Sequence, residues 1–209
     1  MAKTTKFAKR RAEAAKLAGK HADKRRELAE HAISALGNLG YARTTLRDIA
    51  SQSGVSLGIL HYYFEDKVDL ISYCVKLYKE TFVALLDATL GAEIPSDAVP
   101  GKFIDGLVTA VAEHANIHRL WYDIRGQALF DEAFHSVVSE IEDALIGLAA
   151  RLLSRLQVER ASPIGVYLGF DGIFRYYLQR RLLGDGDALV EFRAALAEQF
   201  AALNAGLDL

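Results

Sequence analysis

Residues 44–67, TTLRDIASQSGVSLGILHYYFEDK, decide the fold of this chain. They predict a helix over 46–52, a tight turn, a short helix over 57–64 and the capped start of a third helix. Thr45 and Ser56 are suited to cap the two short helices, and Gly54 permits a left-handed turn between them. Two short helices joined by a glycine turn are typical of a helix-turn-helix, whose second helix enters the major groove of DNA.

The side chains of this segment suit a nucleic-acid surface. Arg47 is the best candidate for reading a base, because its guanidinium matches the acceptor edge of guanine. Hydroxyl and imidazole groups, together with the charge of Lys67, are suited to phosphate, which positions a protein on DNA without reading sequence. Leu57 and Gly58 offer little hydrogen bonding, so thymine methyl contacts and DNA shape would supply specificity there.

The segment resembles the DNA-binding domain of the TetR family of one-component transcriptional regulators. The residues that match the family pattern are Thr45, Ile49, Ala50, Gly54, Val55, Ser56, Gly58, Leu60, Tyr63, Phe64, Lys67 and Leu70. Ser53 stands where alanine is usual, and His61 where tyrosine is common, which leaves that phosphate contact to the neighbouring Tyr62. The resemblance implies a DNA interface formed by Thr44, Thr45, Arg47, Ser56, Leu57, Gly58, His61, Tyr62 and Lys67.

Composition limits the class of protein. The chain has 209 residues, of which 51% are hydrophobic, with three prolines and a single cysteine. These features favour a helical core and exclude an internal disulfide, which fits the cytoplasm as the expected location. We expect neither membrane insertion nor export, since no apolar run is long enough to span a bilayer and the N-terminus lacks an apolar signal core.

Positive charge is concentrated in a basic arm over residues 1–22. Residues 1–26 hold ten Lys or Arg and two Asp or Glu, whereas the remainder holds 15 basic and 25 acidic residues. DNA repels an acidic body, so the molecule should approach DNA with its helix-turn-helix segment in front. The arm either extends the first helix or forms a disordered tail. We expect it to contact phosphates or the minor groove; the alternative is a solvated segment without a role.

Apolar periodicity predicts an all-α fold of about nine helices, without strands or repeats. The helix predicted over 23–39 and the helix-turn-helix segment together form a helix-turn-helix DNA-binding domain over 23–68. A ligand-binding and dimerisation domain follows over 69–209. The helices of the second part are predicted over 67–90, 102–115, 117–129, 131–156, 163–184 and 187–205. The first of these crosses the domain boundary and would link the two parts.

The last two predicted helices carry apolar stripes that suggest a dimer interface. The residues of these stripes are Val166, Phe170, Phe174, Leu178, Leu189, Phe192, Leu196 and Phe200. Two such helices from each subunit would form a symmetric four-helix bundle, and a dimer supplies the two reading helices that a near-palindromic operator requires. The alternative is that the stripes close the core of the monomer.

The middle helices concentrate aromatic and polar side chains, as small-molecule sites do. The candidate ligand contacts are Phe103, His114, His118, Trp121, Tyr122, Arg125, Gln127, Phe130, Phe134 and His135. Arg125 could bind a carboxylate or phosphate. His114 and His118 could share a helix face, but no further ligand lies at a supporting spacing, so no metal site is predicted. The alternative is that most of these residues belong to the core or the surface.

Together these patterns predict a ligand-responsive regulator of transcription that binds DNA as a homodimer. Repression, with release of the operator by a small-molecule effector, is the preferred mechanism, and no cofactor is predicted. A DNA-binding architectural protein without a ligand is the alternative. A helical enzyme is disfavoured, because the sequence has no glycine-rich phosphate loop, nucleophile elbow or metal constellation.

Overall fold

A computed structural model describes residues 2–42 and 44–205 of the chain. Within these ranges the regular structure consists of eight α-helices and three short 3₁₀-helices, which confirms the all-α fold. The helices predicted over 102–115 and 117–129 correspond to the two segments of α5 (Val99–Gln127), which meet at a kink at His114, where φ is −126° and ψ is 22°. The break predicted at residue 116 is therefore present as a kink two residues earlier.

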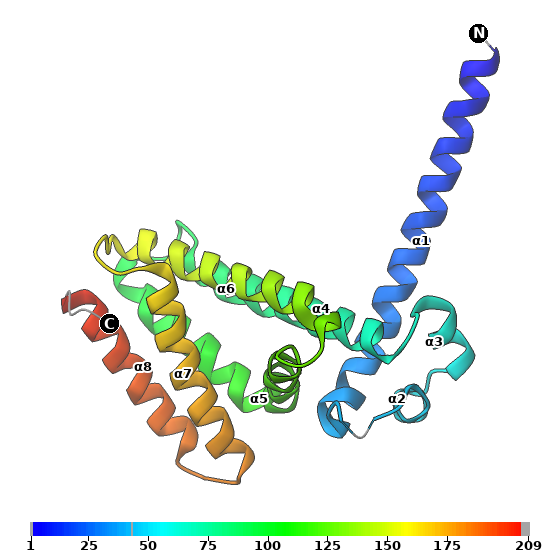
Figure 1. The fold of residues 1–209 in the computed structure, drawn as a ribbon. Coiled ribbons are helices and arrows are strands. Elements are labelled where there is room, and N and C mark those ends of the chain that lie inside the picture. The colour runs from blue at the N-terminus through cyan, green and yellow to red at the C-terminus, as the bar shows by residue number, and fades with distance from the viewer. Residues whose placement is uncertain (1, 43, 206–209) are drawn as a thin grey trace.

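The helices form two groups (Figure 1). α1 (Ala2–Leu39), α2 (Leu46–Ser53) and α3 (Leu57–Tyr63) lie at one end of the molecule. The body consists of α4 (Lys67–Asp87), α5, α6 (His135–Leu156), α7 (Pro163–Leu182) and α8 (Ala188–Ala205). The 3₁₀-helices Ala88–Leu90 and Ser96–Ala98 connect α4 to α5, and Glu132–Phe134 precedes α6.

Side-chain chemistry sets the limits of α2 and α3. The Thr45 hydroxyl accepts a hydrogen bond from the Asp48 amide, and the Asp48 carboxylate accepts one from the Thr45 amide, which is a reciprocal capping box. Gly54 ends α2 with a φ of 69°, in the left-handed region. Ser56 caps α3 by accepting a hydrogen bond from the Ile59 amide. The two helices and their turn therefore follow directly from the sequence.

The first helix is longer than predicted, since α1 begins at Ala2 rather than near residue 23. It continues through the basic arm, which is one of the two alternatives for that segment. Ala, Lys and Arg are strong helix formers, so they propagate a helix that packing has already nucleated. The side chains of residues 1–15 and 17 lie outside the described part of the structure, so the DNA contacts predicted for them are not located.

Two apolar cores stabilise the protein, and three helices cross both. The first core packs α1, α2 and α3 against the N-terminal half of α4, the C-terminal half of α5 and the start of α6. The second core joins the remaining parts of α4, α5 and α6 to α7 and α8. On α4, Leu70 and Cys74 belong to the first core, whereas Phe82 and Leu86 belong to the second. α1, α2 and α3 therefore share their core with the body.

The single cysteine of the chain lies inside the first core. Cys74 is fully buried, and its thiol donates a hydrogen bond to the Ala29 carbonyl at a distance of 3.5 Å, across the contact between α4 and α1. Burial raises the pKa of this thiol, because an apolar environment disfavours the thiolate. Cys74 is thus a packing residue and not a reactive one.

We expect Gly54→Ala to lower the free energy of unfolding by about 1 kcal/mol, because a Cβ strains a backbone in the left-handed region. Gly58→Ala is the matched control, since Gly58 lies within α3 and its Cβ position is open. Alanine at that helical position should stabilise by about 0.5–1 kcal/mol. Urea unfolding measures both changes, and equal stability of the two variants would contradict the left-handed turn.

Candidate DNA interface and ligand pocket

The outer face of α2 and α3 presents most of the residues predicted to contact DNA. The exposed members are Thr45, Arg47, Ser56, Gly58, His61 and Tyr62. Tyr62 has 72% of its surface accessible, whereas Leu57 is half-buried. Exposed guanidinium, hydroxyl and imidazole groups can contact both base edges and phosphates.

Two of the predicted contacts are directed into the protein instead. Thr44 is only 3% exposed and its hydroxyl donates to the Gly40 carbonyl, which removes it from the predicted interface. Lys67 is half-buried; its ammonium donates to the Tyr41 carbonyl at 3.2 Å and lies 4.1 Å from the centre of the Tyr41 ring. Lys67 therefore stabilises the connection between α1 and α2. Its burial and its contacts with Tyr41 compete with contact to a phosphate.

An aromatic contact that the sequence did not predict holds the basic arm beside α3. The ring of His21 on α1 lies 4.6 Å from the ring of Tyr63 and 6.0 Å from that of Tyr62, between centroids. Tyr62 and Tyr63 stack edge to face at 4.9 Å. No spacing rule relates residue 21 to residue 62, so only the packing of α1 on α3 reveals this contact.

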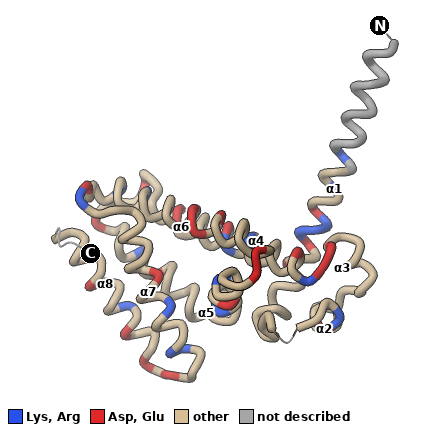
Figure 2. The backbone as a smooth tube through the Cα atoms, viewed as in Figure 1, with Lys and Arg blue, Asp and Glu red and all other residues tan. Residues whose placement is uncertain are grey.

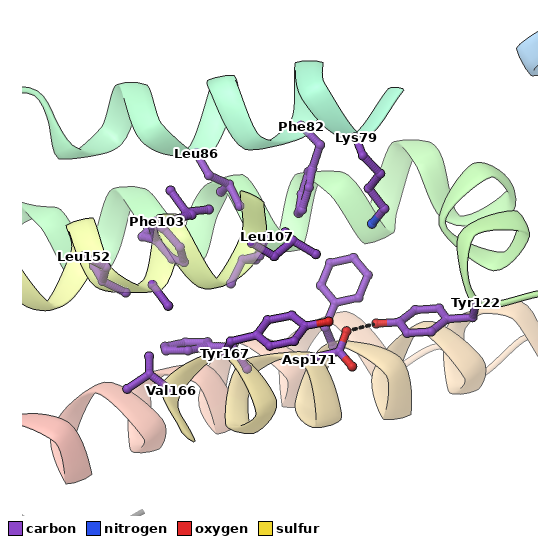
Figure 3. Close-up of a pocket in the computed structure, with 15 residues that line it drawn as sticks. Lys79, Phe82, Leu86, Phe103, Leu107, Tyr122, Leu152, Val166, Tyr167 and Asp171 are labelled. Atoms are coloured by element: carbon purple, nitrogen blue, oxygen red, sulfur yellow. Dashed lines mark hydrogen bonds between the residues drawn. The ribbon is translucent and has the colours of Figure 1, made fainter. Parts of the chain in front are cut away.

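A narrow cavity lies among α4, α5, α6 and α7 in the second core (Figure 3). Its volume is about 70 Å³. The apolar walls include Phe82, Leu86, Phe103, Leu152, Val166 and Phe170. Lys79, Tyr122 and Asp171 lie toward one end of the cavity, as Figure 3 shows. Apolar walls with polar groups at one end are typical of a small-molecule site.

Asp171 joins the polar side chains at that end. One of its carboxylate oxygens accepts a hydrogen bond from the Tyr122 hydroxyl at 2.8 Å, and the other accepts one from Arg125 at 2.7 Å. Arg125 also pairs with Glu142 of α6 at 2.7 Å. Burial raises the pKa of Tyr122, and the charge of Asp171 raises it further, so the phenol remains a hydrogen-bond donor.

Lys79 and His118 form a buried polar pair beside the cavity. Lys79 is 4% exposed, and its Nζ lies 3.2 Å from His118 Nδ1; His118 Nε2 lies 2.9 Å from the Tyr78 hydroxyl. The rings of Phe82 and Trp121 flank the amine, with centroids at 4.9 and 5.2 Å. Burial lowers the pKa of Lys79 to about 7. Burial and the neighbouring Lys79 charge lower the pKa of His118 well below its ordinary value.

The structure brings about half of the predicted ligand contacts to this region. Phe103 and Tyr122 line the cavity, and Arg125 supports its polar end through Asp171. His118 and Trp121 are buried next to Lys79. Sequence reasoning missed Lys79 itself, although a lysine that continues the buried stripe of α4 is a signal that could have found it.

The other predicted ligand contacts lie away from the cavity. Phe134 is fully buried in the first core, where its ring packs edge to face on Tyr41 at 5.2 Å. Phe130 is 88% exposed on the connection after α5, Gln127 ends that helix, and His114 and His135 are also exposed. Clustering along the chain does not determine which face of a helix a residue occupies, and the bend in α5 changes that face.

The predicted dimer stripes are part of the monomer's own core, so this assignment is corrected. Val166, Phe170 and Phe174 line the cavity. Leu178, Phe192, Leu196 and Phe200 are at most 2% exposed, and Leu189 is half-buried against the same core. Buried positions and interface positions share one helical period, so periodicity alone could not separate them.

The described residues contain no group of three or more His, Cys, Asp or Glu side chains placed to hold a metal ion. The environments of the two neighbouring histidines explain why they do not cooperate: His118 is buried against Lys79 and Tyr78, whereas His114 is exposed at the bend of α5. No helix in the same part of the chain is long and apolar enough to cross a membrane.

The structure thus combines an exposed helix-turn-helix, a motif suited to DNA, with a body that contains an internal pocket. Residues 26–74 match the family model described as bacterial regulatory proteins, tetR family. Over these residues the chain is therefore similar to the TetR family of bacterial regulatory proteins. A search of curated protein sequences found no match to the chain.

Solved structures of transcriptional regulators share the fold over nearly their whole length. A regulator from Rhodococcus has a TM-score of 0.72 at 17% identity, covering 87% of this chain and 99% of its own. One from Haloarcula marismortui has a TM-score of 0.68 at 22% identity, covering 87% and 98%. FadR from Bacillus subtilis, solved in complex with stearoyl-CoA, has a TM-score of 0.66 at 16% identity, covering 86% and 97%. At these identities the likeness establishes the fold.

We expect Lys79→Met to raise the free energy of unfolding below pH 7, because it removes a buried cation that lacks a carboxylate partner in the described structure. The folded pKa is about 7 and the ordinary value is 10.5, so between them the unfolded chain binds the extra proton and wild-type stability rises with pH. The variant should lack this rise, which unfolding by urea between pH 7 and about 10 measures.

Lys76→Met is the matched control, because Lys76 lies one turn away on α4 and pairs with Glu140 at the surface. It should keep the rise in stability with pH. A full rise in Lys79→Met would place the titrating group elsewhere.

Proposed function

We propose that this protein is a dimeric transcriptional regulator that binds a near-palindromic operator and is released by a small-molecule effector. The observation that carries the proposal is α4, one continuous helix that starts directly after α3 and also contributes Lys79, Phe82 and Leu86 to the cavity. The resemblance to TetR regulators favours repression as the sign of regulation.

The coupling would act through helices that both cores share. An effector in the cavity repacks α4 and changes the separation of the two reading helices, which must match major grooves about 34–36 Å apart. α5 offers a second route, because Arg119 donates a hydrogen bond at 2.8 Å to the carbonyl of Gly37 near the end of α1. A coupling of about 1–3 kcal/mol would weaken DNA binding roughly 5- to 150-fold.

On DNA, Arg47 reads a base edge while Thr45, Ser56, His61 and Tyr62 contact phosphates. Asp and Glu recur along the body helices, as Figure 2 shows, so the body is repelled from the duplex and α2 and α3 approach first. The basic arm contacts neighbouring phosphates. The contact of His21 with Tyr62 and Tyr63 holds the C-terminal end of this arm beside α3.

The outer face of α7 and α8 forms the dimer interface. These helices lie side by side at the end of the molecule away from α2 and α3 (Figure 1). The exposed apolar residues of this face, called here the outer α7–α8 face, are Ile164, Leu168, Tyr176, Val190, Ala194, Ala197 and Ala201. On α7 the first two are each 53% exposed and one turn apart, and on α8 three alanines permit close helix approach. A second copy that covers these side chains would remove their apolar surface from water.

The structure of FadR with stearoyl-CoA shows that a protein of this fold can hold a ligand with a long apolar part. This supports a ligand role for the cavity of the present protein.

Capture of DNA fragments from the sheared genome at physiological salt tests the proposal. Enrichment of one or a few near-palindromic sites is the expected result, whereas uniform recovery would favour an architectural DNA-binding protein. Deletion of residues 2–15 serves as a control: a regulator keeps its site preference and loses mainly salt-dependent affinity, while an architectural protein loses nearly all binding.

Arg47→Ala should relax sequence preference at one position of each half-site and weaken operator binding by about 1–3 kcal/mol, because a bidentate base contact is lost. Binding to a set of single-base operator variants measures this preference. An unchanged preference with uniformly weaker binding would assign Arg47 to phosphate.

Leu168→Asp should convert the dimer to a monomer, because it would bury an unpaired charge in the interface while leaving the monomer core intact. Sedimentation velocity measures the change. Leu183→Asp is the control: Leu183 is 78% exposed but lies just after α7, outside the outer α7–α8 face, and its variant should remain dimeric. Dimeric Leu168→Asp would move the interface to another surface.

A further inference from the structure

The chemistry of the cavity points to the class of its ligand, an inference that rests on the regulatory function proposed above. We propose that the effector is an anionic amphiphile, a carboxylate on a slender alkyl chain. Its head group pairs with Lys79, and its chain lies along α7 toward Val166. Three properties of the cavity carry this assignment: an unpaired cation, a carboxylate that is already neutralised, and narrow apolar walls.

The cation is Lys79. Its side chain lines the cavity and is 4% exposed, and within the described residues it forms no ion pair. Its amine contacts His118 Nδ1 at 3.2 Å and the faces of two aromatic rings. A buried ammonium without a counter-ion is costly, and a ligand carboxylate at this position would remove that cost.

The anion in the cavity wall is not free to bind a cation. Both oxygens of Asp171 are occupied, by the Tyr122 hydroxyl at 2.8 Å and by Arg125 at 2.7 Å. The Tyr167 hydroxyl, beside Asp171 in Figure 3, is buried and has no hydrogen-bond partner in the described structure. The cavity thus offers two unused donors, on Lys79 and Tyr167, and no unused carboxylate, so it selects an anion.

The apolar part of the ligand is a narrow chain. The wall from Val166 to Phe174 covers about 12 Å of α7 at the helical rise of about 1.5 Å per residue. The volume is only about 70 Å³. A flexible alkyl chain enters such a space with small movements of the surrounding leucine and phenylalanine side chains. A rigid multi-ring ligand would have to force the helices apart against a close-packed core.

Binding of an anion should depend on pH in a defined direction. Without ligand the pKa of Lys79 is about 7, so its amine is mostly protonated below this pH and mostly neutral above it. The titratable and charged groups around it are Tyr78 on its own helix, His118, Tyr122 and Arg125 on α5, Glu142 behind Arg125 on α6, and Tyr167 and Asp171 on α7. His118, Tyr122 and Tyr167 remain neutral across this range, because burial lowers the pKa of the imidazole and raises the pKa of the two phenols. Affinity should therefore fall as pH rises above 7, by up to about tenfold per pH unit.

Isothermal titration calorimetry of the full chain without DNA tests the assignment, with hexanoate, octanoate, decanoate and dodecanoate as probes. Octanol and octylamine supply the same chain as octanoate with a neutral and a cationic head group. We expect at least one carboxylate to bind, octanoate or a neighbour in length to bind more tightly than octanol, and octylamine to bind least. Failure of all four carboxylates, or tighter binding of octylamine than octanoate, overturns the proposal.

Lys79→Met keeps the length of the side chain and removes its charge. It should weaken carboxylate binding by about 10- to 100-fold, the value of a charge-assisted hydrogen bond, and abolish the pH dependence, while octanol binding is retained. Lys76→Met is the control and should bind octanoate as the wild type does. Tyr167→Phe provides a second, milder variant and should weaken carboxylate binding more than octanol binding. Equal carboxylate affinity in wild type and Lys79→Met would overturn the role of Lys79.

Measurement of operator release separates this inference from the proposed function. Carboxylate binding that depends on Lys79 but leaves operator affinity unchanged would support the ligand chemistry and contradict its regulatory role. Specific operator binding by a protein that takes up none of the carboxylates would support a DNA-binding regulator and overturn the ligand class.

Discussion

The structure depends on the continuity of α4 across two cores. Leu70 and Cys74 pack against the DNA-binding helices, and Phe82 and Leu86 pack in the body, on a single helix without a break. A close-packed core tolerates little change in volume, so neither half of α4 can rotate or shift without repacking its own surroundings. Because α5 and α6 also cross both cores, the helix-turn-helix is mechanically part of the body.

The buried polar pair of Lys79 and His118 lies where the two cores meet. Trp121 belongs to the first core and Phe82 to the second, and Lys79 lies between their rings. A leucine at this position would join the cores more simply, and replacing buried ionic groups by apolar ones is often stabilising. The protein instead carries an amine whose pKa is lowered to about 7 by burial. The junction therefore carries a local energetic cost that an apolar residue would not impose.

Local rules predicted the helix-turn-helix accurately and the body less so. The capping residues Thr45 and Ser56 and the left-handed Gly54 act through neighbours in sequence, so their consequences can be read from sequence alone. The stripe that contains Phe174 and Phe192 has the same period whether it faces a second subunit or the same chain. Only tertiary packing distinguishes the two. The contact of His21 with Tyr63 and the pairing of Arg125 with Asp171 join residues far apart in sequence, for which one chain contains no signal.

The burial of Cys74 makes its reaction with a thiol reagent a measure of how often the contact between α1 and α4 opens. Since the chain has one cysteine and that thiol is shielded between α1 and α4, a thiol reagent can modify the native protein only when this contact separates. The rate of modification therefore counts the excursions in which the DNA-binding helices part from α4, without any engineered label. A bound molecule that stabilises the junction between the cores would slow this modification, and one that destabilises the junction would accelerate it. The modification rate of Cys74 therefore measures the stability of that junction.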